Sequence, residues 1–165
     1  MKLFEYQGKC LFSNYGLRVP EGEVLFSADE IEEKTEGIKL PAMVKAQILA
    51  GGRGKAGGVV RVNNTEQLND QVAGMLGREI KGKTVDAVLI EQMVDFIDEY
   101  YISITMDVRS RMPMIMFSAC GGVDIEQVAA SNPENIVRVI IDPLIGAQSF
   151  HVEKMCTISG ITDKN

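Results

Sequence analysis

Apolar residues recur along the chain in two patterns, one helical and one extended. Between residues 64 and 77 they lie three to four positions apart, the spacing of one helix face, whereas residues 85–90 form a mostly apolar run typical of a buried strand. The same criteria, with Gly and Pro as breaks, predict helices at residues 3–15, 27–36, 64–77 and 124–130. They predict strands at residues 22–27, 42–49, 59–63, 85–90, 99–108, 114–119 and 137–141. This α/β (α+β) mixture of helices and hairpins lacks the regular alternation of a doubly wound sheet.

Charge and composition limit the kinds of molecule that the protein is expected to bind. The 165 residues include 17 basic and 23 acidic side chains, giving a net charge of −6, which argues against a general affinity for nucleic acid or anionic lipid. No apolar run approaches the roughly 18 residues that span a bilayer, and the N-terminus resembles neither a signal nor a transit peptide. The three cysteines are too far apart for a CxxC metal site. We expect a cytoplasmic protein with no nucleic-acid or membrane partner.

The segment 50–58, Ala-Gly-Gly-Arg-Gly-Lys-Ala-Gly-Gly, contains five of the 16 glycines, all within the eight positions 51–58. Glycine permits positive φ and lets backbone N–H groups approach an anion with no Cβ in the way. From Lys45 to Arg61 the chain carries four basic residues and no acidic one, although it is acidic overall. The segment is therefore predicted to bind a polyanion.

The residues around this segment indicate which class of glycine-rich loop it belongs to. Its Gly-x-Gly-x-x-Gly, from Gly52 to Gly57, precedes a predicted strand, whereas the dinucleotide fingerprint needs a helix there. A P-loop needs Ser or Thr after its lysine, but Lys55 is followed by Ala56. We interpret the segment as a hairpin lid over a nucleoside triphosphate, with Lys45 on the preceding strand reaching the phosphates. A surface hairpin with solvated basic residues is the alternative.

A second candidate site follows the predicted strand 85–90. The polar stretch from Glu91 to Asp95 suits a hinge between two lobes, whose main-chain N–H and C=O groups recognise the edge of a purine. Glu99 is placed to accept hydrogen bonds from ribose hydroxyls. An ordinary loop and an exposed strand charge are the alternatives.

Several motifs together resemble the N-terminal part of the β subunit of ADP-forming succinyl-CoA synthetase (succinate–CoA ligase). They are Met-Lys-Leu-Phe-Glu-Tyr-Gln-Gly-Lys at 1–9, Val-Lys-Ala-Gln at 44–47 leading into 50–58, Gly-Gly-Val-Asp-Ile-Glu at 121–126 and Asp-Pro-Leu-Ile-Gly at 142–146. The likeness covers nearly the whole chain in one register. The AGGRGKAGG string is far more specific than the Gly-x-Gly-x-x-Gly inside it.

The resemblance implies an ATP-grasp fold, here an N-terminal fragment with two lobes that hold a nucleotide between them. Residues 21–95 would form the smaller lobe with the glycine-rich lid, while 1–20 and 96–165 would belong to a second lobe, incomplete at the C-terminus. The resemblance also implies which residues contact the nucleotide. Lys45 would contact the phosphates, and Gly52, Arg53 and Gly54 would form the lid. Glu91 and Val94 would present main-chain groups to the adenine, and Glu99 would bind the ribose.

In this family ATP phosphorylates a histidine of the α subunit, the phosphate passes to succinate, and coenzyme A attacks the succinyl phosphate. The resemblance therefore implies an ATP/ADP-binding part of an acid–thiol ligase of the citric acid cycle, paired with an α subunit in a heterodimer or heterotetramer. Coenzyme A and succinate would bind to parts not present here. A malate–CoA ligase type of subunit and a non-catalytic nucleotide-binding or interaction module are the alternatives.

The same resemblance limits what the chain is expected to do alone. Family members continue past residue 165 through the ligands of Mg²⁺, so we expect weak ATP binding, no metal ligand, no catalytic residue and no ligase activity in the isolated piece. His151 is expected at a helix start in a structural role, because the family's phosphorylated histidine belongs to the other subunit.

Overall fold

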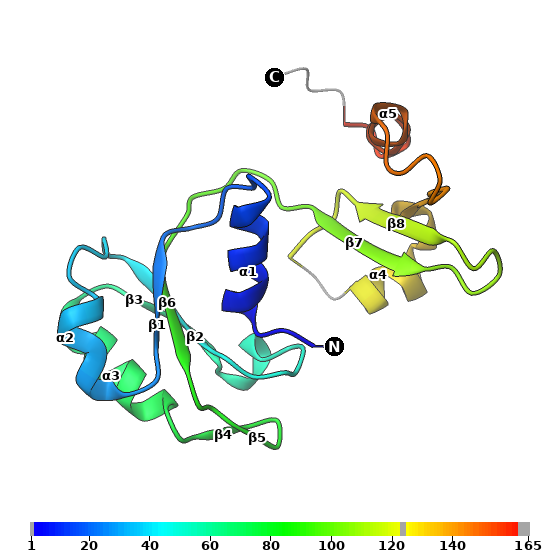
Figure 1. The fold of residues 1–165 in the computed structure, drawn as a ribbon. Coiled ribbons are helices and arrows are strands. Elements are labelled where there is room, and N and C mark those ends of the chain that lie inside the picture. The colour runs from blue at the N-terminus through cyan, green and yellow to red at the C-terminus, as the bar shows by residue number, and fades with distance from the viewer. Residues whose placement is uncertain (1, 123–124, 162–165) are drawn as a thin grey trace. The chain divides into compact units, whose positions relative to one another are not determined.

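A computed structural model of the chain describes residues 2–122 and 125–161. It divides into two compact units, Met1–Asp95 and Phe96–Asn165, called here the first and the second unit (Figure 1). Val123 and Asp124, within the motif at 121–126, lie outside the described residues. Among the helices of the described part, none combines the length and the apolar character needed to cross a membrane.

The first unit is built on a four-stranded antiparallel sheet. Its order is β1 (Gly22–Leu25), β6 (Val88–Gln92), β2 (Ala42–Ala46) and β3 (Val59–Val62). The predicted sequence of strand, glycine-rich loop and strand is confirmed, because β2 and β3 pair directly as the two arms of a hairpin. β6 lies between β1 and β2, so it is hydrogen-bonded on both sides.

Two helical segments cover one face of this sheet. They are α2 (Ile31–Lys34), which follows a 3-10 turn η1 (Ala28–Glu30), and α3 (Thr65–Met75). The predicted helix over residues 64–77 is confirmed as α3, and the Asn64 side chain caps its start by accepting the N–H of Gln67 at 2.8 Å. The helices and this sheet face enclose the core of the unit. Its buried members include Leu25, Ile31, Ala42, Val44, Ala46, Val62, Leu68, Val72, Met75, Val88 and Ile90.

The opposite face of the sheet faces α1 (Glu5–Asn14) (Figure 1). The backbone N–H of Tyr6 donates to the buried side-chain oxygen of Gln47 at 3.2 Å, which ties the first turn of the helix to the end of β2. Residues 1–20 thus group with residues 21–95 in the first unit. α1 leaves Phe12 and Tyr15 exposed. That residues 1–20 belong with the second lobe stays a prediction.

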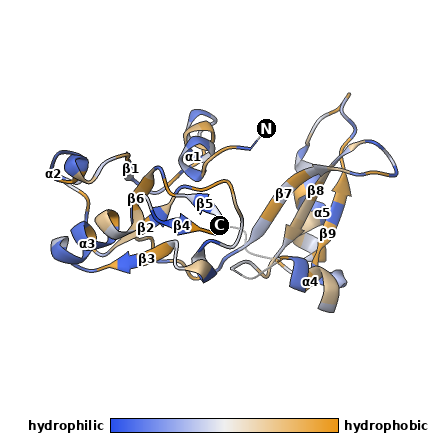
Figure 2. Cartoon of the chain, turned by 90° about the horizontal axis from the view of Figure 1, so that it is seen from below, coloured by the Kyte–Doolittle hydropathy of each residue, from blue (hydrophilic) through white to orange (hydrophobic). Residues whose placement is uncertain are grey.

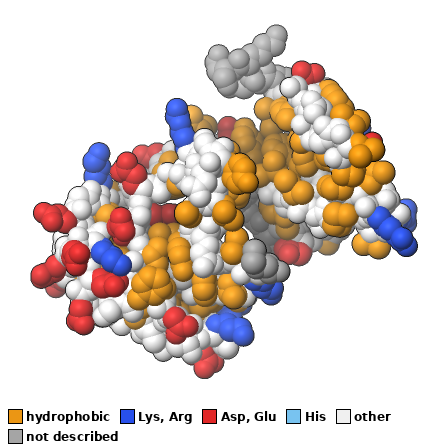
Figure 3. Space-filling model, in the orientation of Figure 1, with side chains coloured by type: hydrophobic (Ala, Val, Ile, Leu, Met, Phe, Trp, Pro, Cys, Tyr) orange, Lys and Arg blue, Asp and Glu red, His pale blue; other side chains and the backbone are white. Residues whose placement is uncertain are grey.

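A short hairpin completes the first unit. It consists of β4 (Glu79–Ile80) and β5 (Lys83–Thr84), and its turn residues Lys81 and Gly82 both have positive φ, 54° and 69°. This turn places Lys81 beside the glycine-rich segment, as described below. Acidic side chains gather instead around α2, at Asp29, Glu30, Glu32 and Glu33 (Figure 3).

The second unit contains a three-stranded antiparallel sheet with helices. The strands are β7 (Tyr101–Met106), β8 (Pro113–Ser118) and β9 (Val137–Ile140), in that order, and β7 and β8 are strongly apolar (Figure 2). The helices are α4 (Ile125–Ser131), a 3-10 turn η3 (Pro133–Asn135) and α5 (Ser149–Ile158). α5 packs against β9, and its Met155 joins a small core with Ile115, Val137, Val139 and Ile141.

His151 lies at the start of α5 and is 7% exposed. Its Nδ1 accepts the backbone N–H of Gln148 at 2.9 Å, which satisfies one of the free N–H groups at the helix start. We therefore expect His151→Ala to lower the free energy of unfolding by about 1–2 kcal/mol in urea denaturation. His151→Gln keeps a side-chain acceptor and should lose less. An equal loss in the two variants would contradict the capping role.

Candidate functional site

The α1 side of the first unit's sheet carries two charged residues on neighbouring strands. Side chains alternate between the two faces of a strand, and residues directly opposite each other share a face. Lys45 of β2 is opposite Leu89, and Glu91 of β6 is opposite Met43, so Lys45 and Glu91 both project to the α1 side. Val44 and Ile90 project to the other side, into the core. The strand register therefore brings Lys45 and Glu91 together.

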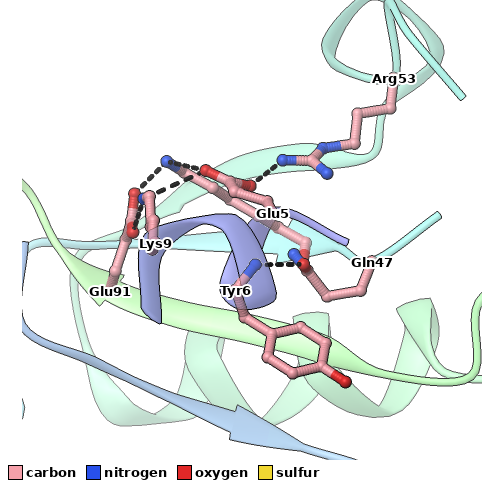
Figure 4. Close-up of polar contacts among 7 residues, drawn as sticks. Glu5, Tyr6, Lys9, Gln47, Arg53 and Glu91 are labelled. Carbon is pink, nitrogen blue, oxygen red and sulfur yellow. Dashed lines mark hydrogen bonds and ion pairs between the residues drawn. The ribbon is translucent and has the colours of Figure 1, made fainter. Parts of the chain in front are cut away.

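These two residues belong to a network of five charged side chains, called here the charge cluster (Figure 4). The Glu91 carboxylate is paired with the ammonium groups of Lys45 and Lys9, one oxygen to each. Glu5 Oε1 lies 3.4 Å from Lys45 Nζ and 3.1 Å from Lys9 Nζ. Glu5 Oε2 is paired with the guanidinium of Arg53. Three cations thus surround two carboxylates.

Burial strengthens the electrostatic interactions of the charge cluster. The Glu91 side chain is 4% exposed, whereas the other four are 17–22% exposed. Loss of hydration lowers the pKa of Lys9 below its usual value, and the hydrogen bond to Glu91 opposes this shift. Burial also lowers the pKa of Arg53, which nevertheless keeps its charge because a guanidinium does not deprotonate at physiological pH. Charges in such a place act more strongly on an incoming anion than they would in water.

The glycine-rich segment supplies Arg53 to this cluster. Between β2 and β3 it forms a 3-10 turn, η2 (Gly54–Ala56), that ends on Gly57 in the left-handed region with φ 76°. The carbonyl of Arg53 accepts the N–H of Gly58 at 2.8 Å, which closes the loop. A Cβ on Gly58 would lie 3.1 Å from that carbonyl oxygen, so the tight closure depends on glycine. Gly52 and Gly54 flank Arg53 in the same loop.

A lysine from another hairpin reaches the same loop. Lys81 Nζ donates to the carbonyl of Gly51 at 2.7 Å and would lie 3.0 Å from a Cβ on Gly52. Lys81, Glu5 and Lys9 are not among the site residues that the sequence predicts. Two local features of the sequence could have indicated these residues. Glu5 and Lys9 are one helical turn apart within a predicted helix, and Lys81-Gly82 forms a turn.

The prediction that the strand ends at residue 90 and a loop begins at Glu91 is wrong. Glu91 lies inside β6, paired opposite Gly22 on one side and Met43 on the other. A carboxylate can occupy a buried strand position here because Lys9 and Lys45 compensate its charge. Periodicity alone treats such a charge as the end of a strand.

The remaining predicted residues lie outside the charge cluster. Val94 follows β6 with a side chain that is 52% exposed. Glu99 belongs to the second unit, where its carbonyl accepts the N–H of Gly121 at 2.8 Å and its carboxylate lies against Gly122. The structure thus joins Lys45, Arg53 and Glu91, while the adenine and ribose roles stay predictions.

Two cavities adjoin the charge cluster. One, of about 410 Å³, is lined by Glu5, Arg53 and the start of the glycine-rich segment. The other, of about 210 Å³, lies between α1 and strands β1 and β6, and is lined by Tyr6, Lys9 and Glu91. A further cavity of about 610 Å³ beside Lys34 contains none of the predicted site residues. The two cavities at the cluster leave space for an anionic ligand next to its cations.

Comparisons with known proteins agree with this architecture. A family model described as "ATP-grasp domain" matches residues 2–165. The chain is 44% identical over 161 residues to the "Succinate--CoA ligase [ADP-forming] subunit beta" of Halobacterium salinarum, covering 98% of this chain and 42% of the relative. It is 43% identical to the protein of the same name from Aquifex aeolicus, covering 94% of this chain and 42% of that one. The chain thus spans about two-fifths of the length of these curated relatives.

A solved structure shares the fold. The crystal structure of PH1788 from Pyrococcus horikoshii matches with a TM-score of 0.67 at 25% identity, covering 94% of this chain and 63% of that one. The α/β fold class with an ATP-grasp architecture, predicted from the sequence, is confirmed.

Proposed function

The chain belongs to the ATP-grasp family, and from this premise we propose that it is the nucleotide-binding part of the β subunit of an ADP-forming succinate–CoA ligase. The full protein would be an acid–thiol ligase of the citric acid cycle in the cytoplasm, working with an α subunit that carries the phosphorylated histidine. Coenzyme A and succinate would bind outside this chain. Relatives of that name, similar over nearly the whole chain, support the proposal.

One observation carries the nucleotide-binding role. Lys45 and Arg53 converge on the same carboxylate, that of Glu5, beneath a glycine-rich loop and beside a cavity. A carboxylate and a phosphate both present oxygen acceptors to ammonium and guanidinium donors, so a site that binds one with two cations fits the other. In the proposal Lys45 and Arg53 bind the phosphates of ATP or ADP, and backbone N–H groups around Gly52 and Gly54 complete the site.

Groups other than the Lys45 and Arg53 side chains would contact the adenine, the ribose and the metal ion. In the proposal, main-chain groups at the end of β6 and just after it, from Glu91 to Val94, would contact the adenine, and Glu99 would bind the ribose. Mg²⁺ would neutralise phosphate charge during transfer. Residues 2–122 and 125–161 offer no group of three or more acidic, His or Cys side chains that could hold a metal ion, so these residues do not supply a magnesium site of their own.

Isothermal titration with ATP, ADP and GTP, with and without Mg²⁺, tests this role. We expect the chain to bind ATP, and we expect Lys45→Ala to weaken that binding at least about tenfold, because a hydrogen bond to a charged group contributes about 1.5–3 kcal/mol. Lys39→Ala, which removes an exposed lysine from the same unit, should leave binding unchanged. Binding that is indifferent to Lys45→Ala, or an equal loss in Lys39→Ala, would contradict the proposal.

A further inference from the structure

We propose that Glu5 is a competing anion: its carboxylate occupies the phosphate position between Lys45 and Arg53 and is exchanged for the nucleotide's phosphate when ligand binds. This inference rests on the proposed function. It makes Glu5 a residue that sets nucleotide affinity from outside the glycine-rich loop.

The geometry at Glu5 is that of a bound anion. One carboxylate oxygen is paired with Arg53, and the other lies 3.4 Å from Lys45 Nζ. A phosphate group held by these two residues would use the same donors. Glu5 and a phosphate therefore cannot both have full contact with Lys45 and Arg53.

Of the two carboxylates in the charge cluster, Glu5 is the one that can leave. Glu91 is 4% exposed and fixed within β6, with strands paired on both sides. Glu5 is 22% exposed, lies in the first turn of α1 and lines the cavity of about 410 Å³. It also contacts Lys9 at 3.1 Å, one helical turn away, and this contact can hold the carboxylate after it releases Lys45 and Arg53.

The charge balance favours exchange over addition. With Glu5 in place the cluster holds three cations and two carboxylates, a formal charge of +1. A polyphosphate added to this arrangement would meet a carboxylate at contact distance, and like charges repel. When Glu5 releases the two cations, Lys45 and Arg53 face the phosphates directly, with Glu91 as the remaining fixed counter-ion.

The exchange also changes what holds the glycine-rich loop. The Glu5–Arg53 pair ties this loop to α1 across 48 residues of sequence. Ligand binding would replace the contact of Arg53 with Glu5 of α1 by a contact with the phosphate. Arg53 would then link the loop to α1 without ligand and to the ligand when it is bound. Glu5 then lowers affinity for the nucleotide and speeds its release.

Titration of ATP and of inorganic tripolyphosphate into Glu5→Gln and the parent chain tests the exchange. Glutamine keeps the size of the side chain but removes its charge, so we expect both ligands to bind about tenfold more tightly. Glu66→Gln is the matched control: Glu66 is also in the first turn of a helix of the same unit, is exposed, and its loss changes the net charge equally. It should leave both affinities unchanged. Glu5→Asp, which keeps the charge but shortens its reach, should fall between parent and Gln.

The outcomes separate this inference from the proposed function. ATP binding by the parent that is unchanged or weakened in Glu5→Gln, with Glu5→Asp also no tighter than the parent, overturns the exchange and leaves nucleotide binding intact. An equal gain in Glu66→Gln also overturns it, because net charge alone would then explain the effect. Binding by Glu5→Gln but not by the parent supports the exchange in its strongest form. Absence of binding in all the variants overturns both.

Discussion

Glu91→Gln is expected to lower the free energy of unfolding by about 3–5 kcal/mol, because it leaves two partly buried ammonium groups without their main counter-ion. The Glu91 side chain is 4% exposed and is paired with both Lys9 and Lys45. Glu5 remains as a counter-ion, but at 3.1 and 3.4 Å it must then serve both lysines and Arg53. Urea denaturation followed by circular dichroism measures the loss.

A second substitution distinguishes a charge effect from lost packing. Lys9→Met removes one of the two cations that lose Glu91 as a partner and keeps an unbranched apolar chain of similar length. The double variant Glu91→Gln with Lys9→Met should therefore recover a substantial part of the loss. Glu23→Gln, at an exposed strand position in β1, should change stability by no more than about 0.5 kcal/mol. A loss below about 1 kcal/mol in Glu91→Gln would show that the cluster does not depend on this carboxylate.

Gly22→Ala is expected to destabilise the chain by about 3 kcal/mol through steric overlap with the neighbouring strand. Gly22 is opposite Glu91 in the register, and a Cβ on Gly22 would lie 2.4 Å from the carbonyl oxygen of Ile90 and 2.7 Å from the Cβ of Glu91. Backbone would have to move to relieve this overlap. Because β6 carries Glu91, the same movement should disturb the charge cluster and weaken ATP binding.

Gly74→Ala provides a control of opposite sign. Gly74 lies within α3 and is exposed, and a Cβ there meets nothing within 4 Å. Alanine in a helix interior is more favourable than glycine, so this variant should gain about 0.5–1 kcal/mol. If both substitutions shifted the urea midpoint in the same direction, the close approach of β1 to β6 would not be the cause.

The sequence predicted the elements whose determinants are local. The helix α3 followed from apolar residues at helical spacing, and the structure confirms it. The hairpin of β2 and β3 followed from the glycine-rich segment between two apolar runs, and Lys45 lies on the strand that enters it, as expected. The family resemblance also predicted the ATP-grasp fold.

What the sequence left open depends on contacts between distant residues. The sheet order places β6 between β1 and β2, and no local sequence pattern specifies which strands pair with each other. Glu91 and Lys9 are 82 residues apart, and Glu5 and Arg53 are 48 apart, so their mutual neutralisation cannot be seen from spacing. Spacing alone therefore predicts a loop at Glu91 and does not single out Glu5 as part of the site.

In the proposed site, Lys45 and Arg53 bind the phosphates of a nucleotide. A crystal structure of the chain with ADP or a non-hydrolysable ATP analogue tests it most directly. We expect phosphate oxygens about 2.7–3.0 Å from Lys45 Nζ and from an Arg53 guanidinium nitrogen, with the Glu5 carboxylate displaced from both. A nucleotide bound elsewhere on the chain, with Lys45 and Arg53 still paired to Glu5, would contradict it.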